Sequence, residues 1–176
     1  MKKLFALMLA LCLLGSCCAV AEEGTKEISW GDVEAISALH EGSFQAIADT
    51  GLIMYVPNSF AAVELTEEQI AQGNFFLLKD ENNYRVSAML QSLGTLELSD
   101  FVAEQLKAGA TEMEEVALNG IPAMSFEFDV NGEKIGCIAF YNDTDNTVLT
   151  LSFAPANDEA YQEIIALMSG SIQAAE

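Results

Sequence analysis

The densest group of oxygen-bearing side chains in this sequence is the run Asn-Asp-Thr-Asp-Asn at residues 142–146. Carboxylate and amide oxygens at this spacing resemble the start of a calcium-binding loop. A complete EF-hand loop also needs glycine at its sixth position, but Val148 stands there when counting from Asp143. The same residue types are favoured in tight turns. The run therefore predicts a hairpin turn and no metal site, and it leaves open whether Asp143 and Asp145 bind a cation.

General acid-base and nucleophilic catalysis need a base beside the reacting group, and histidine is the usual base. His40 is the single histidine, and it falls at the predicted end of a short helix, where a cation is favoured by the helix dipole alone. Acidic clusters at residues 64–68 and 112–115 could supply paired carboxylates for glycoside hydrolysis. Neighbouring side chains on a strand point to opposite faces, so a solvated acidic surface is the preferred interpretation.

These patterns predict a protein that is not an enzyme, with no catalytic residue, no metal ligand and no cofactor. The alternative is a hydrolase that uses carboxylates, with or without a divalent cation. We expect the aromatic residues of the predicted strands to form core and cross-strand pairs rather than a platform for sugars.

Residues 1–21 have the three parts of a bacterial export signal. Lys2 and Lys3 form a positive beginning, residues 4–14 form an apolar run, and Ala19-Val20-Ala21 supplies the small residues of a cleavage site. The apolar run is about half the ~20 residues that a transmembrane helix needs. We therefore predict that residues 1–21 are a signal peptide, that the mature chain is secreted or at the cell surface, and that no transmembrane span follows.

A lipid anchor is the alternative form of export. Leu14-Gly15-Ser16-Cys17 resembles the lipobox of bacterial lipoproteins, in which Cys17 is acylated and becomes the new N-terminus. Ala19-Val20-Ala21 would then have no purpose, which favours ordinary secretion. Both routes stay open, and the second makes the protein a lipid-anchored assembly factor.

Cleavage after Ala21 leaves 155 residues, which is enough for one domain of ordinary size. All 27 acidic residues but only five of the seven basic residues lie in this part, so its net charge is −22. Such a charge argues against nucleic acid and anionic membranes as partners and leaves a protein, glycan or small ligand. One cysteine, Cys137, remains. Its apolar neighbours predict a buried, inert thiol without a disulfide.

Hydrophobic periodicity indicates an α+β fold. Asn119-Gly120 and Asn131-Gly132 are strong hairpin signals between β-rich runs, so the second half of the chain predicts a four-strand antiparallel meander. We expect a central antiparallel sheet of about seven strands. The predicted strands are 44–48, 52–56, 74–79, 84–91, 112–118, 121–128, 134–140 and 147–153, while residues 28–30 either begin a strand or anchor the terminus.

Helix signals lie between these strands. Asp32 is the expected N-cap of a helix at 32–39, and Thr66 with Gln69 has the spacing of a capping box. Ser99 is expected to cap the next helix, and Asn157 or Asp158 to cap the last one, which should lie across the meander and close its core.

The order of these segments resembles the PsbP and Mog1-like superfamily. The resemblance runs from about Phe44 to Ile172, and it includes the apolar strand Leu52–Val56 followed by Pro57, and the hairpin Leu118–Ala123. Its motifs are structural, and it implies an α/β/α sandwich with binding and assembly roles and no shared active site. The sequence resembles a group of uncharacterised secreted proteins of anaerobic gut-type bacteria more closely than it resembles the superfamily as a whole.

This organisation predicts a signal peptide at 1–21, a lead-in with a short helix at 22–41, and a single α+β domain at 42–176. The expected function is that of an exported, non-catalytic domain that binds a protein, glycan or small ligand. Its oligomeric state cannot be predicted from the sequence.

Overall fold

The computed structural model describes residues 25–175. The predicted signal peptide and Cys17 lie outside the described residues. None of the helices within them has the length and apolar character needed to cross a bilayer.

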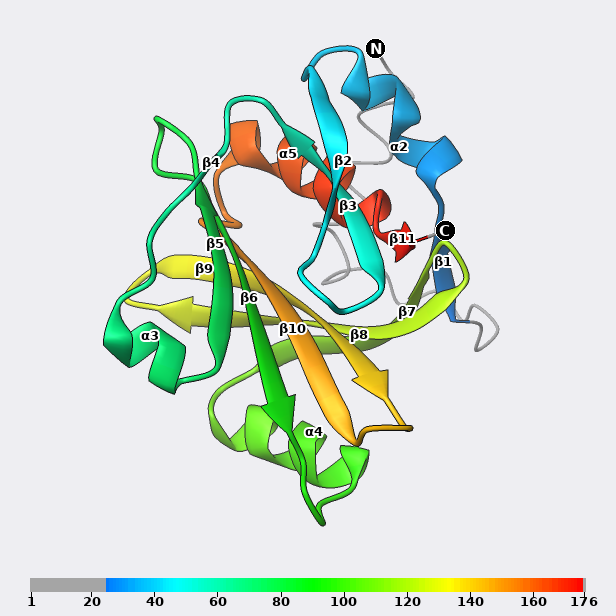
Figure 1. Cartoon of the computed structure of the whole chain (residues 1–176), viewed down its shortest axis with the longest axis vertical. Coiled ribbons are helices and arrows are strands. Elements are labelled where there is room, and N and C mark those ends of the chain that lie inside the picture. The colour runs from blue at the N-terminus through cyan, green and yellow to red at the C-terminus, as the bar shows by residue number, and fades with distance from the viewer. Residues whose placement is uncertain (1–24, 176) are drawn as a thin grey trace.

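The described chain forms two sheets and four helices (Figure 1). The main sheet has the order β1 (Lys26–Ile28), β7 (Thr111–Leu118), β8 (Ile121–Val130), β9 (Glu133–Asn142), β10 (Thr147–Ala154), β6 (Arg85–Ser92), β5 (Asn74–Lys79) and β4 (Ala61–Ala62). The small sheet has the order β11 (Gln173–Ala174), β3 (Leu52–Pro57) and β2 (Gly42–Ala46). The helices are α2 (Trp30–Ser37), α3 (Glu67–Ala71), α4 (Leu98–Lys107) and α5 (Glu159–Gly170).

Two Asn-Gly turns build the predicted meander. Asn119 and Gly120 have φ angles of 49° and 78°, and Asn131 and Gly132 have φ angles of 57° and 85°. Left-handed backbone at both central positions matches the twist of the flanking strands. The turns join β7 to β8 and β8 to β9, and a polar turn then joins β9 to β10. The C-terminal four-strand antiparallel meander is therefore confirmed.

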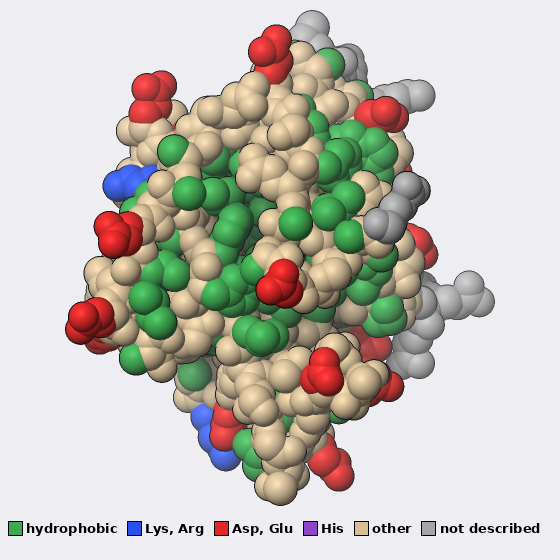
Figure 2. Space-filling view, viewed as in Figure 1, with side chains coloured by type: hydrophobic (Ala, Val, Ile, Leu, Met, Phe, Trp, Pro, Cys, Tyr) green, Lys and Arg blue, Asp and Glu red, His purple; other side chains and the backbone are tan. Residues whose placement is uncertain are grey.

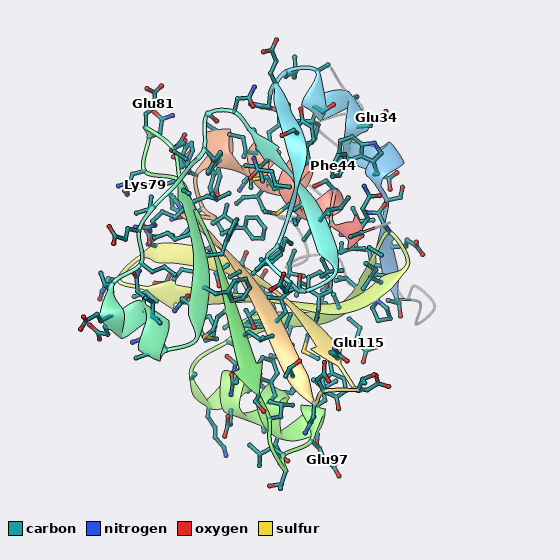
Figure 3. The ribbon with its side chains drawn as sticks, viewed as in Figure 1. Glu34, Phe44, Lys79, Glu81, Glu97 and Glu115 are labelled. Carbon is teal, nitrogen blue, oxygen red and sulfur yellow. The ribbon has the colours of Figure 1, made fainter. Side chains whose placement is uncertain are left out.

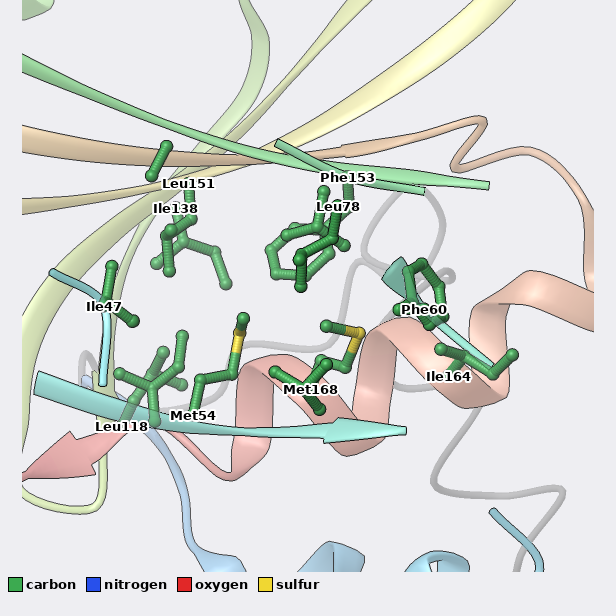
Figure 4. Close-up of a cluster of buried hydrophobic side chains, with 14 of the residues drawn as sticks. Ile47, Met54, Phe60, Leu78, Leu118, Ile138, Leu151, Phe153, Ile164 and Met168 are labelled. Carbon is green, nitrogen blue, oxygen red and sulfur yellow. The ribbon is translucent and has the colours of Figure 1, made fainter. Parts of the chain in front are cut away.

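The main sheet lies between two unequal layers. We call the face covered by α5 and the small sheet the front face, and the face covered by α4 the back face (Figure 1). Strand alternation assigns side chains to these faces, so Leu149, Leu151 and Phe153 of β10 join the front core and Val148 joins the back core. Figure 4 shows the front core between α5, β3 and the main sheet. The predicted α+β sheet flanked by helices is confirmed.

Helix α5 is held against the sheet by its aromatic and small residues. Tyr161 stacks on Tyr84 with ring centroids 4.3 Å apart, and its hydroxyl donates to the carbonyl of Arg85 at 3.0 Å. Burial raises the pKa of Tyr161. Gly170 lets α2 approach closely, since a Cβ there would lie 2.9 Å from Cγ1 of Val33. These contacts fix α5 and α2 over one end of the front face.

Asn119 also ties the first Asn-Gly turn to the end of α5. Its Nδ2 donates to the carbonyls of Gly170 and Ile172 at 2.9 and 2.8 Å. Its Oδ1 accepts from the backbone amide of Trp30 at 2.6 Å. One side chain therefore joins the sheet, the end of α5 and the beginning of α2.

The sheet differs from expectation in three details. It has eight strands rather than about seven, because short strands β1 and β4 pair with its edges. Strand β1 runs parallel to β7, so the sheet is not wholly antiparallel. The hairpin β2–β3 leaves the main sheet and pairs with β11, because it stacks over the front core instead of extending an edge.

Two helices begin earlier than expected. Asp32 is not the N-cap of α2; its Oδ2 instead accepts from the backbone amide of Ser29 at 2.8 Å, and Ser29 is the N-cap. Ser99 lies inside α4, whose N-cap is Glu97, and Asp100 accepts from the Glu97 amide at 2.9 Å. In both helices a carboxylate in the first turn reaches back to an otherwise unpaired amide.

The other helix signals are confirmed. Thr66 caps α3 with the expected capping box, and Asp158 caps α5 by accepting from the amide of Ala160 at 2.9 Å. The division of the chain at residues 1–21, 22–41 and 42–176 stays a prediction.

Candidate functional site

The oxygen-rich run at 142–146 forms the β9–β10 turn, as predicted. Nδ2 of Asn142 donates to Oδ2 of Asp145 at 3.2 Å, and the amide of Thr144 donates to Oδ1 of Asn142 at 3.0 Å. The Thr144 hydroxyl donates to Oδ1 of Asp143 at 3.4 Å. These local bonds account for the composition of the turn. Across residues 25–175, no group of three or more His, Cys, Asp or Glu side chains is arranged to hold a metal ion.

The other candidate residues lie on separate elements. His40 lies in the loop between α2 and β2, where its carbonyl accepts from the Tyr55 hydroxyl at 3.1 Å. The acidic residues at 64–68 lie at the exposed start of α3, and those at 112–115 lie on β7. The structure therefore does not bring these groups together into one site.

Cys137 is buried on the back face of β9, with 5% of its surface exposed. Its Sγ lies 3.5 Å from the hydroxyl oxygen of Ser152. Burial raises the pKa of the thiol to about 11, while the contact with Ser152 acts in the opposite direction. A reactive cysteine has a lowered pKa, so Cys137 has the properties of a packing residue.

Two of the hollows on the described surface differ in volume and lining. The smaller has a volume of about 110 Å³ and lies between α5 and strands β7–β9, with Leu118, Ile138 and Ile165 among its lining residues. The larger has a volume of about 760 Å³, and we call it the open hollow. Pockets for small molecules span ~300–1,000 Å³, so the open hollow is the candidate site.

The floor of the open hollow is hydrophobic and crosses five adjacent strands. Ile121, Phe140, Leu149, Leu90 and Phe75 come from β8, β9, β10, β6 and β5, in the order of the sheet. Leu149 pairs directly with Phe140 on one side and with Leu90 on the other. Leu90 is 45% exposed, although it occupies the same face as the fully buried Val86 and Ala88. Figure 2 shows hydrophobic side chains over the middle of this face, with no Lys or Arg side chain among them.

The walls of the open hollow come from three parts of the chain. The β2–β3 turn supplies Asp49, the start of β3 supplies Leu52, helix α3 supplies Ile70, and the β9–β10 turn supplies Asp143 and Asp145. Ile70 is 58% exposed. The floor is only partly open, because Leu90 is 45% exposed whereas Phe140 and Leu149 are 6% and 5% exposed and belong to the front core.

Gly73 permits the close approach of α3 and β5 to the floor. Its φ is +89°, and the amide of Leu90 donates to its carbonyl at 3.1 Å. A Cβ at this position would lie 2.8 Å from the carbonyl oxygen of Leu90. Both the backbone conformation and the space therefore require glycine here.

The rim of the open hollow is acidic. Its three charged lining residues are Asp49, Asp143 and Asp145, and its neutral polar lining residues include Thr50, Asn74, Asn142 and Thr147. No Lys, Arg or His is among the lining residues. The hollow thus combines a hydrophobic floor with negative charge at its edge.

The sequence predicts that Asp143 and Asp145 lie in a turn, and it leaves open whether they bind a cation. It does not predict that Asp49 and the hydrophobic floor belong to the same site. Leu90 continues the alternation that buries Val86 and Ala88, so the sequence contains no signal that Leu90 is uncovered. The closeness of the β2–β3 and β9–β10 turns depends on how the hairpin stacks over the sheet.

The comparisons with known proteins concern the fold. No family model and no curated protein matches the chain. The solution structure of CyanoP, the cyanobacterial PsbP of Synechocystis sp. PCC 6803, matches with a TM-score of 0.54 and 14% identity over 93% of this chain and 99% of that chain. The chain has a PsbP-like fold. The resemblance inferred from the segment order is therefore confirmed for the architecture.

Two further structures match the PsbP-like domain with lower scores. LpqN, which is involved in cell envelope biogenesis of Mycobacterium tuberculosis, has a TM-score of 0.47 and 14% identity over 85% of this chain and 99% of that chain. A Bacteroides thetaiotaomicron protein has a TM-score of 0.45 and 17% identity over 77% of this chain and 49% of that chain. The greater closeness to secreted proteins of gut-type bacteria stays a prediction.

Proposed function

We propose that this chain is an exported, non-catalytic domain that binds a ligand with a large apolar part in the open hollow. The observation that carries the proposal is the hydrophobic floor, to which five adjacent strands contribute and on which Leu90 is 45% exposed while Phe75 and Ile121 are half-buried. Contiguous hydrophobic surface of this kind marks binding sites in soluble domains. The volume of about 760 Å³ suits a small molecule.

The chemistry of the lining supports binding rather than turnover. The polar lining groups are carboxylates, amides and hydroxyls, while His40 and Cys137 lie elsewhere. Asp143 and Asp145 are engaged with Thr144 and Asn142 of their own turn. A glycoside hydrolase instead needs two carboxyl groups that face each other across the scissile bond.

Export is supported by the sequence of residues 1–21, with its positive start, apolar run and Ala-Val-Ala site. The proposal extends to relatedness with the secreted proteins of anaerobic gut-type bacteria. Mass spectrometry of the protein isolated from its host measures the mature N-terminus. We expect Glu22 as the first residue, and an acylated Cys17 in that position would show a lipid-anchored protein instead.

Binding in the hollow is testable with N-phenyl-1-naphthylamine, a neutral aromatic dye that fluoresces in apolar sites. We expect the wild-type protein to bind the dye, and Leu90→Asn to weaken binding at least fivefold because it places an amide in the middle of the floor. Leu106→Asn is the matched control, since Leu106 is 53% exposed but lies on α4.

The two variants should unfold at the same denaturant concentration, because each replaces a side chain that is already about half exposed. A wild-type protein that does not bind the dye would exclude the hollow as a binding site. Equal weakening by Leu90→Asn and Leu106→Asn would place the dye outside the hollow. Either result overturns the proposal.

A further inference from the structure

The charges around the open hollow specify the class of ligand, if the proposed function holds. Asp49 approaches from the β2–β3 turn, and Asp143 and Asp145 approach from the β9–β10 turn. Two turns that are distant in the sequence thus place three carboxylates at the edge of one hydrophobic floor. The lining residues contain no basic side chain that could neutralise them.

Two of the basic residues of the domain form ion pairs away from this rim. Arg85 pairs with Glu133, and Nζ of Lys134 lies 2.8 Å from Oε2 of Glu127. Neither of these two ion pairs includes a rim carboxylate. Because the chain after Ala21 also carries a net charge of −22, the rim lies in a negative field from the whole molecule.

We infer that the open hollow takes a small amphiphilic cation, in which an ammonium group is attached to an apolar body. The apolar body would lie on the accessible hydrophobic surface of Leu90, Phe75 and Ile70, and the ammonium group would lie at the acidic rim. An anionic ligand of the same shape would be repelled, and a neutral ligand would gain from the floor only. The hollow has the volume of a small-molecule pocket, which favours a small cation over a basic peptide.

A metal ion fits the rim less well than an organic cation. Calcium takes six to eight oxygen ligands, usually from several carboxylates and carbonyls at once. No such group of acidic side chains occurs in the described chain, and the two aspartates of the β9–β10 turn are hydrogen-bonded within that turn. An organic cation needs only one carboxylate near its ammonium group and a hydrophobic surface for its apolar body.

The test measures displacement of N-phenyl-1-naphthylamine by three ligands with the same eight-carbon chain: octyltrimethylammonium, 1-octanol and octanoate. In 20 mM salt we expect the cation to bind about tenfold more tightly than the alcohol, and octanoate to bind most weakly. In 0.5 M salt the preference for the cation should fall to about twofold, because salt screens charges at an exposed rim.

Two triple variants separate the rim from the overall charge. Asp49→Asn/Asp143→Asn/Asp145→Asn should abolish the preference for the cation and leave octanol binding unchanged. Glu34→Gln/Glu81→Gln/Glu104→Gln removes the same total charge from exposed positions outside the hollow and should keep most of the preference. Figure 3 shows Glu34 and Glu81 at the margin of the molecule, away from its centre.

Each outcome of this experiment is decisive. If none of the three ligands displaces the dye, the hollow is not a binding site and the proposed function fails. If octanol and the cation bind equally well, the hollow binds apolar ligands but the inference about charge is wrong. Equal losses in the two triple variants would assign the preference to the overall field. If an eight-residue Lys-Leu peptide displaces the dye at a hundredfold lower concentration than the cation does, the inference is wrong and the hollow binds a basic peptide instead.

Discussion

The front face of the main sheet has a covered end and an open end that are built from the same strands. At the covered end, Leu151 and Phe153 of β10 lie beneath α5 and the small sheet and are at most 1% exposed. At the open end, Leu90 of β6 lies in the floor of the open hollow and is 45% exposed, although its partner Leu149 on β10 is 5% exposed. The strands keep their alternation throughout, so the difference lies in what covers them.

This difference separates stability from binding. Hydrophobic side chains that helix α5 covers lose their contact with water on folding, and their burial stabilises the domain. Leu90 and Ile70 remain about half exposed, so they contribute less to folding and are available to a ligand. The open end therefore should tolerate substitutions that the covered end does not.

The largest predicted effect is on the covered end. Leu151→Ala should lower the free energy of unfolding by about 3 kcal/mol, because it leaves a cavity around a side chain with no exposed surface. Leu90→Ala should lower it by less than about 1 kcal/mol. Urea unfolding followed by circular dichroism measures both changes, and similar losses at the two positions would show that the open end is also part of the stabilising core.

The attachment of α5 to the sheet gives the next largest effect. Asn119→Gly keeps a residue that adopts the left-handed backbone but removes three side-chain hydrogen bonds to Trp30, Gly170 and Ile172. At about 1 kcal/mol for each bond, less some compensation by water, we expect a loss of about 2 kcal/mol.

The matched control is Asn131→Gly in the second Asn-Gly turn. Asn131 has a similar φ angle but is exposed, and its turn is braced by Asp129, whose Oδ1 accepts from the Gly132 amide at 2.8 Å. We expect a change of less than about 0.5 kcal/mol in urea unfolding. If the two variants lose the same stability, the side-chain bonds of Asn119 do not hold the covered end together.

The architecture could be predicted because its signals are local. The Asn-Gly pairs specify left-handed turns through their own backbone preferences, and the apolar face of α5 specifies a helix that must cover a sheet. The N-cap of α2 was predicted three residues too late, because Ser29 and Asp32 can each satisfy a free amide. Nothing local in β2 and β3 shows that their hairpin forms a separate sheet.

The candidate site could not be predicted for the opposite reason. Asp49 and Asp143 become neighbours on one rim only after the hairpin β2–β3 has stacked over the meander. The extent of that cover also decides that Leu90 is open while Ala88 is buried, although both belong to one alternating pattern. A ligand can bind here because no other element fully covers Leu90. The alternation of hydrophobic residues within one strand does not show which of them another element will cover.

The smallest predicted effect concerns the back face, which α4 covers. It tests whether burial there changes the titration of a side chain. There the thiol of Cys137 is buried, and its pKa is raised from the ordinary 9.0 to about 11. Between these two values the unfolded chain releases the thiol proton and the folded chain retains it, so stability must fall as pH rises. From pH 8 to pH 10 this contributes a loss of about 1.3 kcal/mol.

Cys137→Val removes the titrating group while filling a similar volume. Other groups also titrate in this range, but their contribution is common to both proteins. The informative quantity is therefore the difference in unfolding free energy between wild type and variant, measured in urea at pH 8 and pH 10. That difference should move by about 1.3 kcal/mol in favour of the variant at the higher pH. A difference that stays constant, together with rapid alkylation of the native thiol, would mean that water reaches Cys137 and that the back face is open as well.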